Sequence, residues 1–175
     1  MGYRLLDEAR FPLCAEDVES GLVHLRDDIE RRGGDPERIY LAGASSGAML
    51  AAQVGFRPES MLPPDLVKGL VLISGFYGFS NRPDEMVDRS SPRYVDDPCE
   101  SMVVLPLHVI TAAGDNDMPG YLPDSERMAN AVVAAGGSAE HFLVVSADHF
   151  ESTRTFIAPD GDVARATSRM MRIGG

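Results

Sequence analysis

A pentapeptide, GASSG at residues 43–47, constrains the folding of this chain more than any other feature. Residues 39–43 (IYLAG) form a short apolar run that is typical of a buried strand. Residues 47–54 are rich in Ala, Met and Leu, which favour a helix. A strand that passes into a helix through so few residues brings the two backbones almost into contact, so only small residues fit beside the turn. The pattern predicts a sharp strand–turn–helix unit with Ser45 at its apex.

The rest of the chain alternates between strand-like and helix-like segments in the same way. Such alternation predicts parallel β-α-β units, and hence a single α/β domain over residues 1–175 with a mostly parallel sheet flanked by helices. The predicted strands are 39–43, 67–74, 105–113 and 141–146, and the predicted helices are 15–32, 47–54, 123–135 and 150–173, the last one broken at 159–161. Residues 77–104 are rich in Pro, Asp, Ser and Arg, and we expect them to form an excursion over the sheet with a short helix near 84–88.

Composition excludes several classes of function. Hydrophobic residues make up 44% of the 175 residues and charged residues 25%, as in an ordinary globular domain. The net charge of −11 disfavours binding to nucleic acid or to anionic membrane surfaces. Two cysteines are too few for a disulfide framework, and neither a secretory leader nor a bilayer-spanning apolar run is recognisable. The simplest expectation is a cytoplasmic protein.

The glycines around the turn select one of its two serines as a nucleophile. Ser45 has Gly43 and Gly47 two residues before and after it, whereas the corresponding neighbours of Ser46 are alanines. The pattern G-x-S-x-G between a strand and a helix is typical of a nucleophile elbow, in which the next residue supplies a backbone N–H to an oxyanion hole. The alternative is a glycine-rich turn with incidental serines. We expect Ser45 to be the nucleophile and Ser46 the oxyanion donor.

A serine nucleophile requires a base that overhangs the same edge of the sheet. His149 follows the last predicted strand directly and meets this requirement. His24 lies in the first predicted helix, His108 inside a strand and His141 at the start of a strand, on the opposite edge. The sequence therefore favours His149 as the base.

The acid that orients the base should follow the preceding strand. The segment GDND at 114–117 does so, and from position alone either Asp115 or Asp117 could serve, the other being a turn-capping residue. The resulting order along the chain, Ser then Asp then His, is the one used by hydrolases with a nucleophile elbow. Metal or nucleotide chemistry is disfavoured, because no H-E-x-x-H, G-x-G-x-x-G or P-loop pattern occurs. We expect no metal and no cofactor.

Several segments together resemble the α/β-hydrolase-3 and acetylesterase (BD-FAE-like) group, which includes hormone-sensitive-lipase-like esterases and kynurenine formamidase-like enzymes. The segments that carry the resemblance are YRL at 3–5, FP at 11–12, EDV at 16–18, GDPERI at 34–39, GASSG at 43–47, GLVLISG at 69–75, GDND at 114–117 and DHF at 148–150. In that group the last aspartate of the GxND pattern is the acid. The resemblance therefore implies that Asp117 is the partner of His149.

The resemblance also implies a partial α/β-hydrolase fold with its N-terminal strands missing. Members of the group carry further strands and a His-Gly-Gly loop before the YRL segment, whereas this sequence starts at Met1, just before it. That loop supplies further oxyanion donors, and the loss of one such donor typically costs about 3 kcal/mol of transition-state stabilisation. The strand at 39–43 would then have one open edge. Three alternatives follow: the chain is a fragment, it is a truncated gene product, or it completes its sheet by pairing with a second copy as a homodimer.

The expected reaction is hydrolysis of a small-molecule carboxylic ester, or of an N-formyl amide, through an acyl-enzyme on Ser45. Four side chains that follow strand ends are candidates for an apolar substrate pocket, with plain packing as the alternative for each: Tyr77, Phe79, Met118 and Tyr121. The rival hypothesis is a catalytically impaired hydrolase-fold remnant that acts as a binding or interaction module. The absent loop favours the remnant, and the retained Ser, Asp and His favour the enzyme.

Overall fold

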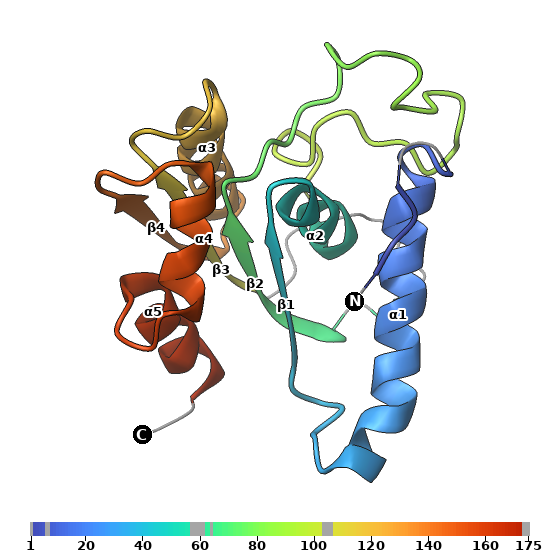
Figure 1. The fold of residues 1–175 in the computed structure, drawn as a ribbon. Coiled ribbons are helices and arrows are strands. Elements are labelled where there is room, and N and C mark those ends of the chain that lie inside the picture. The colour runs from blue at the N-terminus through green and yellow to red at the C-terminus, as the bar shows by residue number, and fades with distance from the viewer. Residues whose placement is uncertain (1, 6–7, 57–61, 64, 103–106, 173–175) are drawn as a thin grey trace.

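The computed structural model describes residues 2–5, 8–56, 62–63, 65–102 and 107–172. The described strands form a parallel four-stranded sheet in the order β1-β2-β3-β4 (Figure 1). The strands are β1 (Ile39–Ala44), β2 (Val67–Ile73), β3 (His108–Gly114) and β4 (Ser138–Val144). The helices are α1 (Leu13–Ile29), which ends in a 3-10 turn η1 (Glu30–Arg32), α2 (Ser46–Phe56), α3 (Tyr121–Ala134), α4 (His149–Ile157) and α5 (Asp162–Met171). This is the partial α/β-hydrolase architecture that the sequence predicts.

Two hydrophobic cores cover the two faces of the sheet, because side chains alternate along each strand. Leu70 and Leu72 of β2 pack into a core with residues of α1, α2 and α3. Val71 and Ile73, the intervening residues, pack on the other face against Val163 and neighbours from α4 and α5. The central strands are therefore mostly apolar, as expected for a parallel sheet covered on both sides.

Residues 74–107 connect β2 to β3 without a helix or strand among the described positions. Ion pairs tie this excursion to helices. Arg93 lies 2.8 Å from Glu16 and 2.5 Å from Glu19, both on α1. Arg127 of α3 lies 2.7 Å from Asp97. The predicted short helix at 84–88 is wrong. The Met86 carbonyl accepts from Phe11 N–H and the Asp88 N–H donates to the Phe11 carbonyl, so these backbone groups serve a bridge to the N-terminal segment instead.

The ends of several elements differ from prediction, most of all the start of β4. β4 begins at Ser138 rather than 141, because Ser138, Ala139 and Glu140 pair with the first residues of β3. The predicted start of β3 at 105 lies outside the described residues. β1 pairs with β2 on one side and is an edge strand of the described sheet. Pairing of two copies along it stays a prediction. None of the described helices is long and apolar enough to cross a membrane.

Candidate active site

Ser45 occupies a strained turn between β1 and α2. Its φ is +54°, a left-handed conformation that side chains other than glycine rarely adopt, and such strain is typical of functional turns. The Ser45 N–H donates to the Ile73 carbonyl at 2.9 Å, which fixes the turn to the end of β2. A Cβ atom on Gly43 would lie 2.2 Å from the Gly47 carbonyl oxygen, so strand and helix backbones nearly touch there.

The requirement for a small residue holds at one of the two glycines only. A Cβ atom on Gly47 would meet no atom of the described structure within 4 Å. The expectation that both glycines are sterically required is therefore wrong at Gly47. The side-chain position at Gly47 faces open space, whereas the side-chain position at Gly43 faces the backbone of α2.

Ser46 begins α2, so helix geometry leaves its backbone N–H without an intrahelical acceptor. The helix dipole adds to the attraction of this end for negative charge. The Ser46 hydroxyl is exposed and lies 2.9 Å from the Tyr3 hydroxyl. The side chain is thus engaged by the N-terminal segment, while the main-chain N–H lies at the first residue of the helix.

Asp117 and His149 form a buried pair at the carboxyl ends of β3 and β4. Oδ1 of Asp117 lies 2.8 Å from Nδ1 of His149, and the two side chains are only 1% and 15% exposed. Asp115, the alternative acid, is exposed and donates its own N–H to the Val144 carbonyl. The structure therefore brings Asp117, and not Asp115, against the imidazole.

Ser74 supplies a further contact to this pair that sequence analysis missed. Its hydroxyl donates to Oδ2 of Asp117 at 2.6 Å, and the Met118 N–H donates to Oδ1 at 2.7 Å. Ser74 is fully buried and, like Ser45, has a left-handed backbone, with φ at +48°. The sequence did offer one indication of this role: Ser74 follows β2, the strand beside the one that carries Asp117.

His149 is the first residue of α4, and a capping box fixes it there. The Asp148 side chain accepts hydrogen bonds from the N–H groups of Phe150 and Glu151, and the Glu151 side chain accepts from the Asp148 N–H. The ring of Tyr121 packs edge-on against the imidazole, with centroids 4.9 Å apart. Because Nδ1 faces Asp117, Nε2 is the ring nitrogen that remains for a reacting group.

The structure reverses the expected positions of two other histidines. His108 is the first residue of β3 and contacts Ser138 and Glu140, whereas His141 lies inside β4 and contacts the Thr111 hydroxyl at 2.9 Å. Burial lowers the pKa of His141. Neither contacts the pair described above, and His24 is exposed on α1. The described residues contain no cluster of His, Cys, Asp and Glu that could hold a metal ion.

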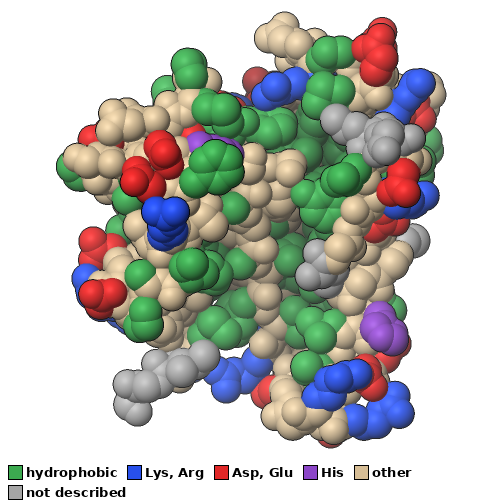
Figure 2. Space-filling view, in the orientation of Figure 1, with side chains coloured by type: hydrophobic (Ala, Val, Ile, Leu, Met, Phe, Trp, Pro, Cys, Tyr) green, Lys and Arg blue, Asp and Glu red, His purple; other side chains and the backbone are tan. Residues whose placement is uncertain are grey.

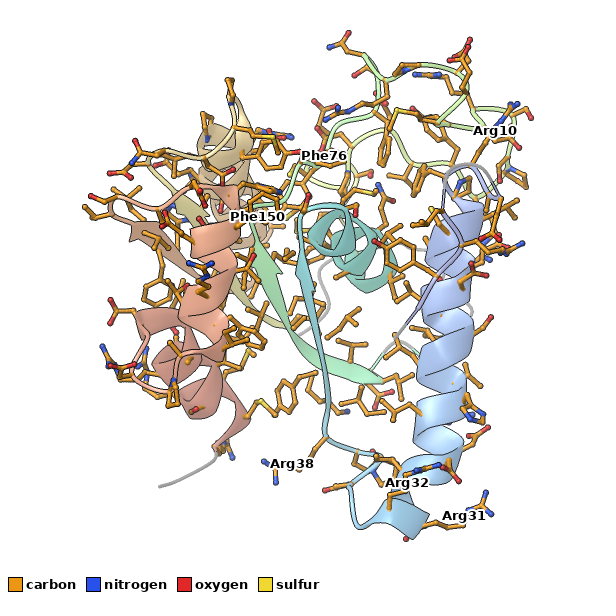
Figure 3. The ribbon with its side chains drawn as sticks, viewed as in Figure 1. Arg10, Arg31, Arg32, Arg38, Phe76 and Phe150 are labelled. Carbon is orange, nitrogen blue, oxygen red and sulfur yellow. The ribbon has the colours of Figure 1, made fainter. Side chains whose placement is uncertain are left out.

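The four candidate pocket residues lie in different surroundings. Met118 lines a hollow of about 340 Å³ together with His149 and Phe150. Phe79 lines a separate cavity of about 400 Å³ beside Ser46, and Tyr121 contacts His149 as described. Tyr77 is fully buried in the core and takes the packing role. Phe76, which sequence analysis did not single out, lies at the same end of the sheet as Phe150 (Figure 3).

Comparison with known proteins identifies the family. A family model described as alpha/beta hydrolase fold matches residues 1–149. This chain is an α/β-hydrolase. Solved structures that resemble this hydrolase include a truncated carbohydrate esterase from gut microbiota, with a TM-score of 0.73, 18% identity and coverage of 98% of this chain and 72% of that one. An esterase from Thermogutta terrifontis has the same TM-score and identity, with coverage of 98% and 66%. At such identities the likeness shows the fold.

Curated relatives of this α/β-hydrolase align over part of their length. A probable isoprenylcysteine alpha-carbonyl methylesterase of Oryza sativa subsp. japonica is 28% identical over 177 residues, which is 84% of this chain and 42% of the relative. Arylacetamide deacetylase of Oryctolagus cuniculus is 48% identical over 54 residues, or 30% of this chain and 14% of the relative. The matched regions thus span less than half the length of both relatives.

Proposed function

We propose that this α/β-hydrolase cleaves carboxylic esters, with Ser45 as nucleophile, His149 as base and Asp117 as the acid that orients it. The observation that carries the proposal is the 2.8 Å contact between Asp117 and His149 at the edge of the sheet where the Ser45 turn also lies. Parallel strands present their carboxyl ends at one edge, so residues that follow β1, β3 and β4 share it. The names of the curated relatives, a methylesterase and a deacetylase, support the same class.

In the proposed reaction Ser45 Oγ forms a bond to the ester carbonyl carbon while Nε2 of His149 takes the hydroxyl proton. The backbone N–H of Ser46 binds the oxyanion that develops. Collapse of this intermediate breaks the bond to the alcohol oxygen, which receives the proton from His149. Water then attacks the acyl-enzyme with His149 again as base, and the carboxylic acid leaves as the Ser45 proton is restored. Asp117 stabilises the charged imidazole throughout.

An N-formyl or aryl amide is the second substrate class for the same site. The aryl amide follows from the name of the arylacetamide deacetylase relative, and the N-formyl amide follows from the resemblance to kynurenine formamidase-like enzymes. Either amide requires His149 to protonate a poorer leaving group, an amine. Esters come first, because an alkoxide or phenolate departs more easily from the same intermediate. Comparison of a p-nitrophenyl ester with the matching anilide measures this preference directly.

Hydrolysis of p-nitrophenyl butyrate by the wild type and by Ser45→Ala tests the nucleophile. We expect turnover in the wild type and none above background in Ser45→Ala, with a fluorophosphonate probe labelling Ser45 in peptide mass spectra. Ser46→Ala retains its main-chain N–H and should lose far less turnover. Undiminished turnover in Ser45→Ala, or labelling of another serine, would refute the assignment. No turnover in folded wild type would favour the non-catalytic remnant.

A further inference from the structure

A hollow of about 520 Å³ lies where β1 and β2 begin, beside the end of α5. Its volume is within the range of small-molecule binding sites. The residues that line it are Glu37, Arg38, Tyr40, Lys68, Met170 and Arg172. Ser45 follows the other end of β1, and the six residues of that strand span about 20 Å when extended. The hollow is therefore separate from the proposed active site.

Positive charge collects at this hollow although the chain as a whole is acidic, with a net charge of −11. Lys68 is the only lysine of the sequence, and it lines the hollow together with two arginines. Glu37 is the one carboxylate among the described lining residues, so three positive charges face one negative charge. Figure 2 shows Lys and Arg side chains at the end of the molecule where β1 begins. Coulombic attraction therefore favours an anion in this hollow.

The three cations have few partners of their own. No hydrogen bond or ion pair within the described part of the chain engages the Arg172 side chain. Nζ of Lys68 lies 3.6 Å from Asp65, a loose pair because the Asp65 side chain is 74% exposed. Arg38 donates one N–H from Nη2 to the Met171 carbonyl at the end of α5 (Figure 3). A guanidinium has five N–H donors, so Arg38 keeps others for a ligand.

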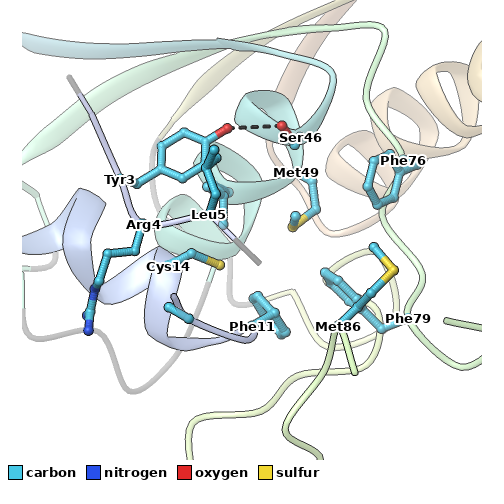
Figure 4. Close-up of a pocket in the computed structure, with 12 residues that line it drawn as sticks. Tyr3, Arg4, Leu5, Phe11, Cys14, Ser46, Met49, Phe76, Phe79 and Met86 are labelled. Atoms are coloured by element: carbon cyan, nitrogen blue, oxygen red, sulfur yellow. Dashed lines mark hydrogen bonds between the residues drawn. The ribbon is translucent and has the colours of Figure 1, made fainter. Parts of the chain in front are cut away.

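The two arginines of the hollow differ from the other arginines in their lack of a carboxylate partner. Most of the described arginines form an ion pair, as Arg127 does with Asp97 at 2.7 Å. The cavity beside Ser46 is lined mainly by hydrophobic side chains, and its arginine, Arg4, lies 2.7 Å from Asp17 (Figure 4). A ligand with its own negative charge would supply the partner that the arginines of the hollow lack.

Phosphate is the anion that suits this set of donors. Guanidinium groups bind phosphate oxygens through two parallel N–H bonds, and an ammonium group adds a point charge. The walls suit an organic group, because Tyr40 and Met170 meet over the backbone of Gly69. A Cβ atom on Gly69 would lie 3.3 Å from Tyr40 Cδ1 and 2.6 Å from Met170 Sδ. The Glu37 carboxylate accepts hydrogen bonds from hydroxyl groups, such as those of a sugar.

We propose that this hollow binds an organic phosphate of nucleotide size. The phosphate contacts Arg38, Lys68 and Arg172, and the organic part lies against Tyr40 and Met170. The ligand then joins the end of α5 to the first residues of β1 and β2, so its binding stabilises the folded chain. The site goes beyond the proposed function, because none of its residues belongs to the proposed catalytic group.

Titration calorimetry of the wild type with adenosine monophosphate (AMP) tests the proposal. We expect AMP to bind, inorganic phosphate to bind at least about tenfold more weakly, and adenosine not to bind, because the phosphate supplies the charge and the nucleoside supplies the wall contacts. No heat from AMP at about 10 mM, above the millimolar Kd of a weak site, would overturn the proposal. Equal affinity for AMP and phosphate, or for AMP and adenosine, would overturn it as well.

Arg172→Gln removes one cation at little risk to folding, because Arg172 is exposed just after α5. The Kd for AMP should rise at least about tenfold, as expected for loss of one hydrogen bond between charged groups. Lys68→Gln should have a similar effect. Arg154→Gln is the matched control, because Arg154 is also exposed, has no carboxylate partner among the described residues and does not line the hollow. Wild-type affinity in both Arg172→Gln and Lys68→Gln, or an equal loss in Arg154→Gln, would overturn the proposal.

Lys68 allows an independent test because it is the only lysine. Reductive methylation with isotope-labelled formaldehyde marks its Nζ and the α-amino group of the chain, and both groups keep their charge. AMP should shift the methyl resonance of Lys68 in a saturable way, with the Kd found by calorimetry, and should leave the α-amino resonance in place. A Lys68 resonance that stays fixed at saturating AMP would overturn the proposal.

Hydrolysis of p-nitrophenyl butyrate separates this site from the proposed active site. Saturating AMP should leave KM for the ester unchanged, and Ser45→Ala should bind AMP with the Kd of the wild type. Competitive inhibition by AMP, or loss of AMP binding in Ser45→Ala, would place the ligand at the Ser45 turn and overturn the proposal. A wild type that binds AMP but hydrolyses no ester would refute the proposed function alone.

Discussion

The hydroxyl of Ser74 donates a 2.6 Å hydrogen bond to Oδ2 of Asp117, and both side chains are almost completely removed from solvent. Oδ1 of the same carboxylate faces His149 and the Met118 N–H, so three groups from three segments fix its plane. A buried carboxylate oxygen without a donor is costly, and hydrogen bonds to charged groups are among the stronger ones in proteins. Ser74 therefore helps to fix the orientation of the Asp117 carboxylate relative to the imidazole of His149.

Replacement of Ser74 by alanine should lower kcat for p-nitrophenyl butyrate by about tenfold to a hundredfold, the range expected from loss of one charge-assisted hydrogen bond. KM should change little, because Ser74 lies behind the acid and lines none of the hollows described above. Ser125→Ala, at another fully buried serine, is the control. Equal loss in both alanine variants would indicate general destabilisation.

The two aspartates of the GDND segment should differ sharply in their effect on turnover. Asp117→Asn removes the charge that faces His149, and the equivalent change in a serine protease triad lowers kcat about 10⁴-fold. Asp115 is exposed and its side chain is not among the contacts of the imidazole, so Asp115→Asn should remain within about twofold of the wild type. Steady-state kinetics of the pair decide the matter. A large loss of kcat in Asp115→Asn, without one in Asp117→Asn, would make Asp115 the acid instead of Asp117.

The two glycines of the turn provide a matched test of its geometry. Gly43→Ala places a methyl group 2.2 Å from the Gly47 carbonyl oxygen and should destabilise the fold by about 1–3 kcal/mol or more. Gly47→Ala fills open space within α2 and should stabilise it by about 0.5–1 kcal/mol, because alanine favours helices. Urea unfolding of both variants measures the difference. Similar losses of stability would show that the helix start is packed differently.

Stability should decrease on mild acidification because of His141. Burial lowers the pKa of His141 in the folded state, although the negative charge of Glu126, whose carboxylate lies 4.0 Å away, raises it in part. The other polar neighbours of His141 are the hydroxyls of Thr111 and Ser125. Below the unfolded pKa near 6.5 the unfolded chain binds a proton that the folded chain does not, so the free energy of unfolding falls as pH falls from 7 toward the folded pKa. His141→Gln should flatten this slope in urea unfolding between pH 7 and pH 5. His24→Gln, at an exposed position, should not, and an equal slope in His141→Gln would exclude this origin.

The sequence predicts the order and type of elements because the residues that begin and end each element lie within or beside that element. Apolar runs in the 67–74 and 105–113 segments predict the central strands, and the glycine pairs at 33–34 and 136–137 mark the ends of two helices. The first residues of β4 were missed because Ser138, Ala139 and Glu140 have no strand pattern of their own. They are extended because β3 offers them backbone partners, and such tertiary pairing overrides local propensity.

The candidate site was predicted where a residue's role follows from its place at a strand end, and missed where it depends on packing. His149 was predicted in this way. Asp117 was preferred to Asp115 only through the family resemblance, and the structure places Asp117 in contact with His149. Ser74 also follows a strand, but no motif around it assigns it a role. Phe76 reaches the site through the ring of Tyr121, at a centroid distance of 5.8 Å, and no spacing rule anticipates such a contact.

Main-chain geometry alone sets the location of Ser45. Its left-handed φ and its amide bond to Ile73 hold the Cα–Cβ vector in place whatever atom follows. The turn therefore fixes the position of Cβ, so a cysteine at this position would carry its sulfur on the same Cβ position that carries the serine oxygen. Exchange of oxygen for sulfur would alter the reactivity of the group, while the position of the residue at the turn would remain the same.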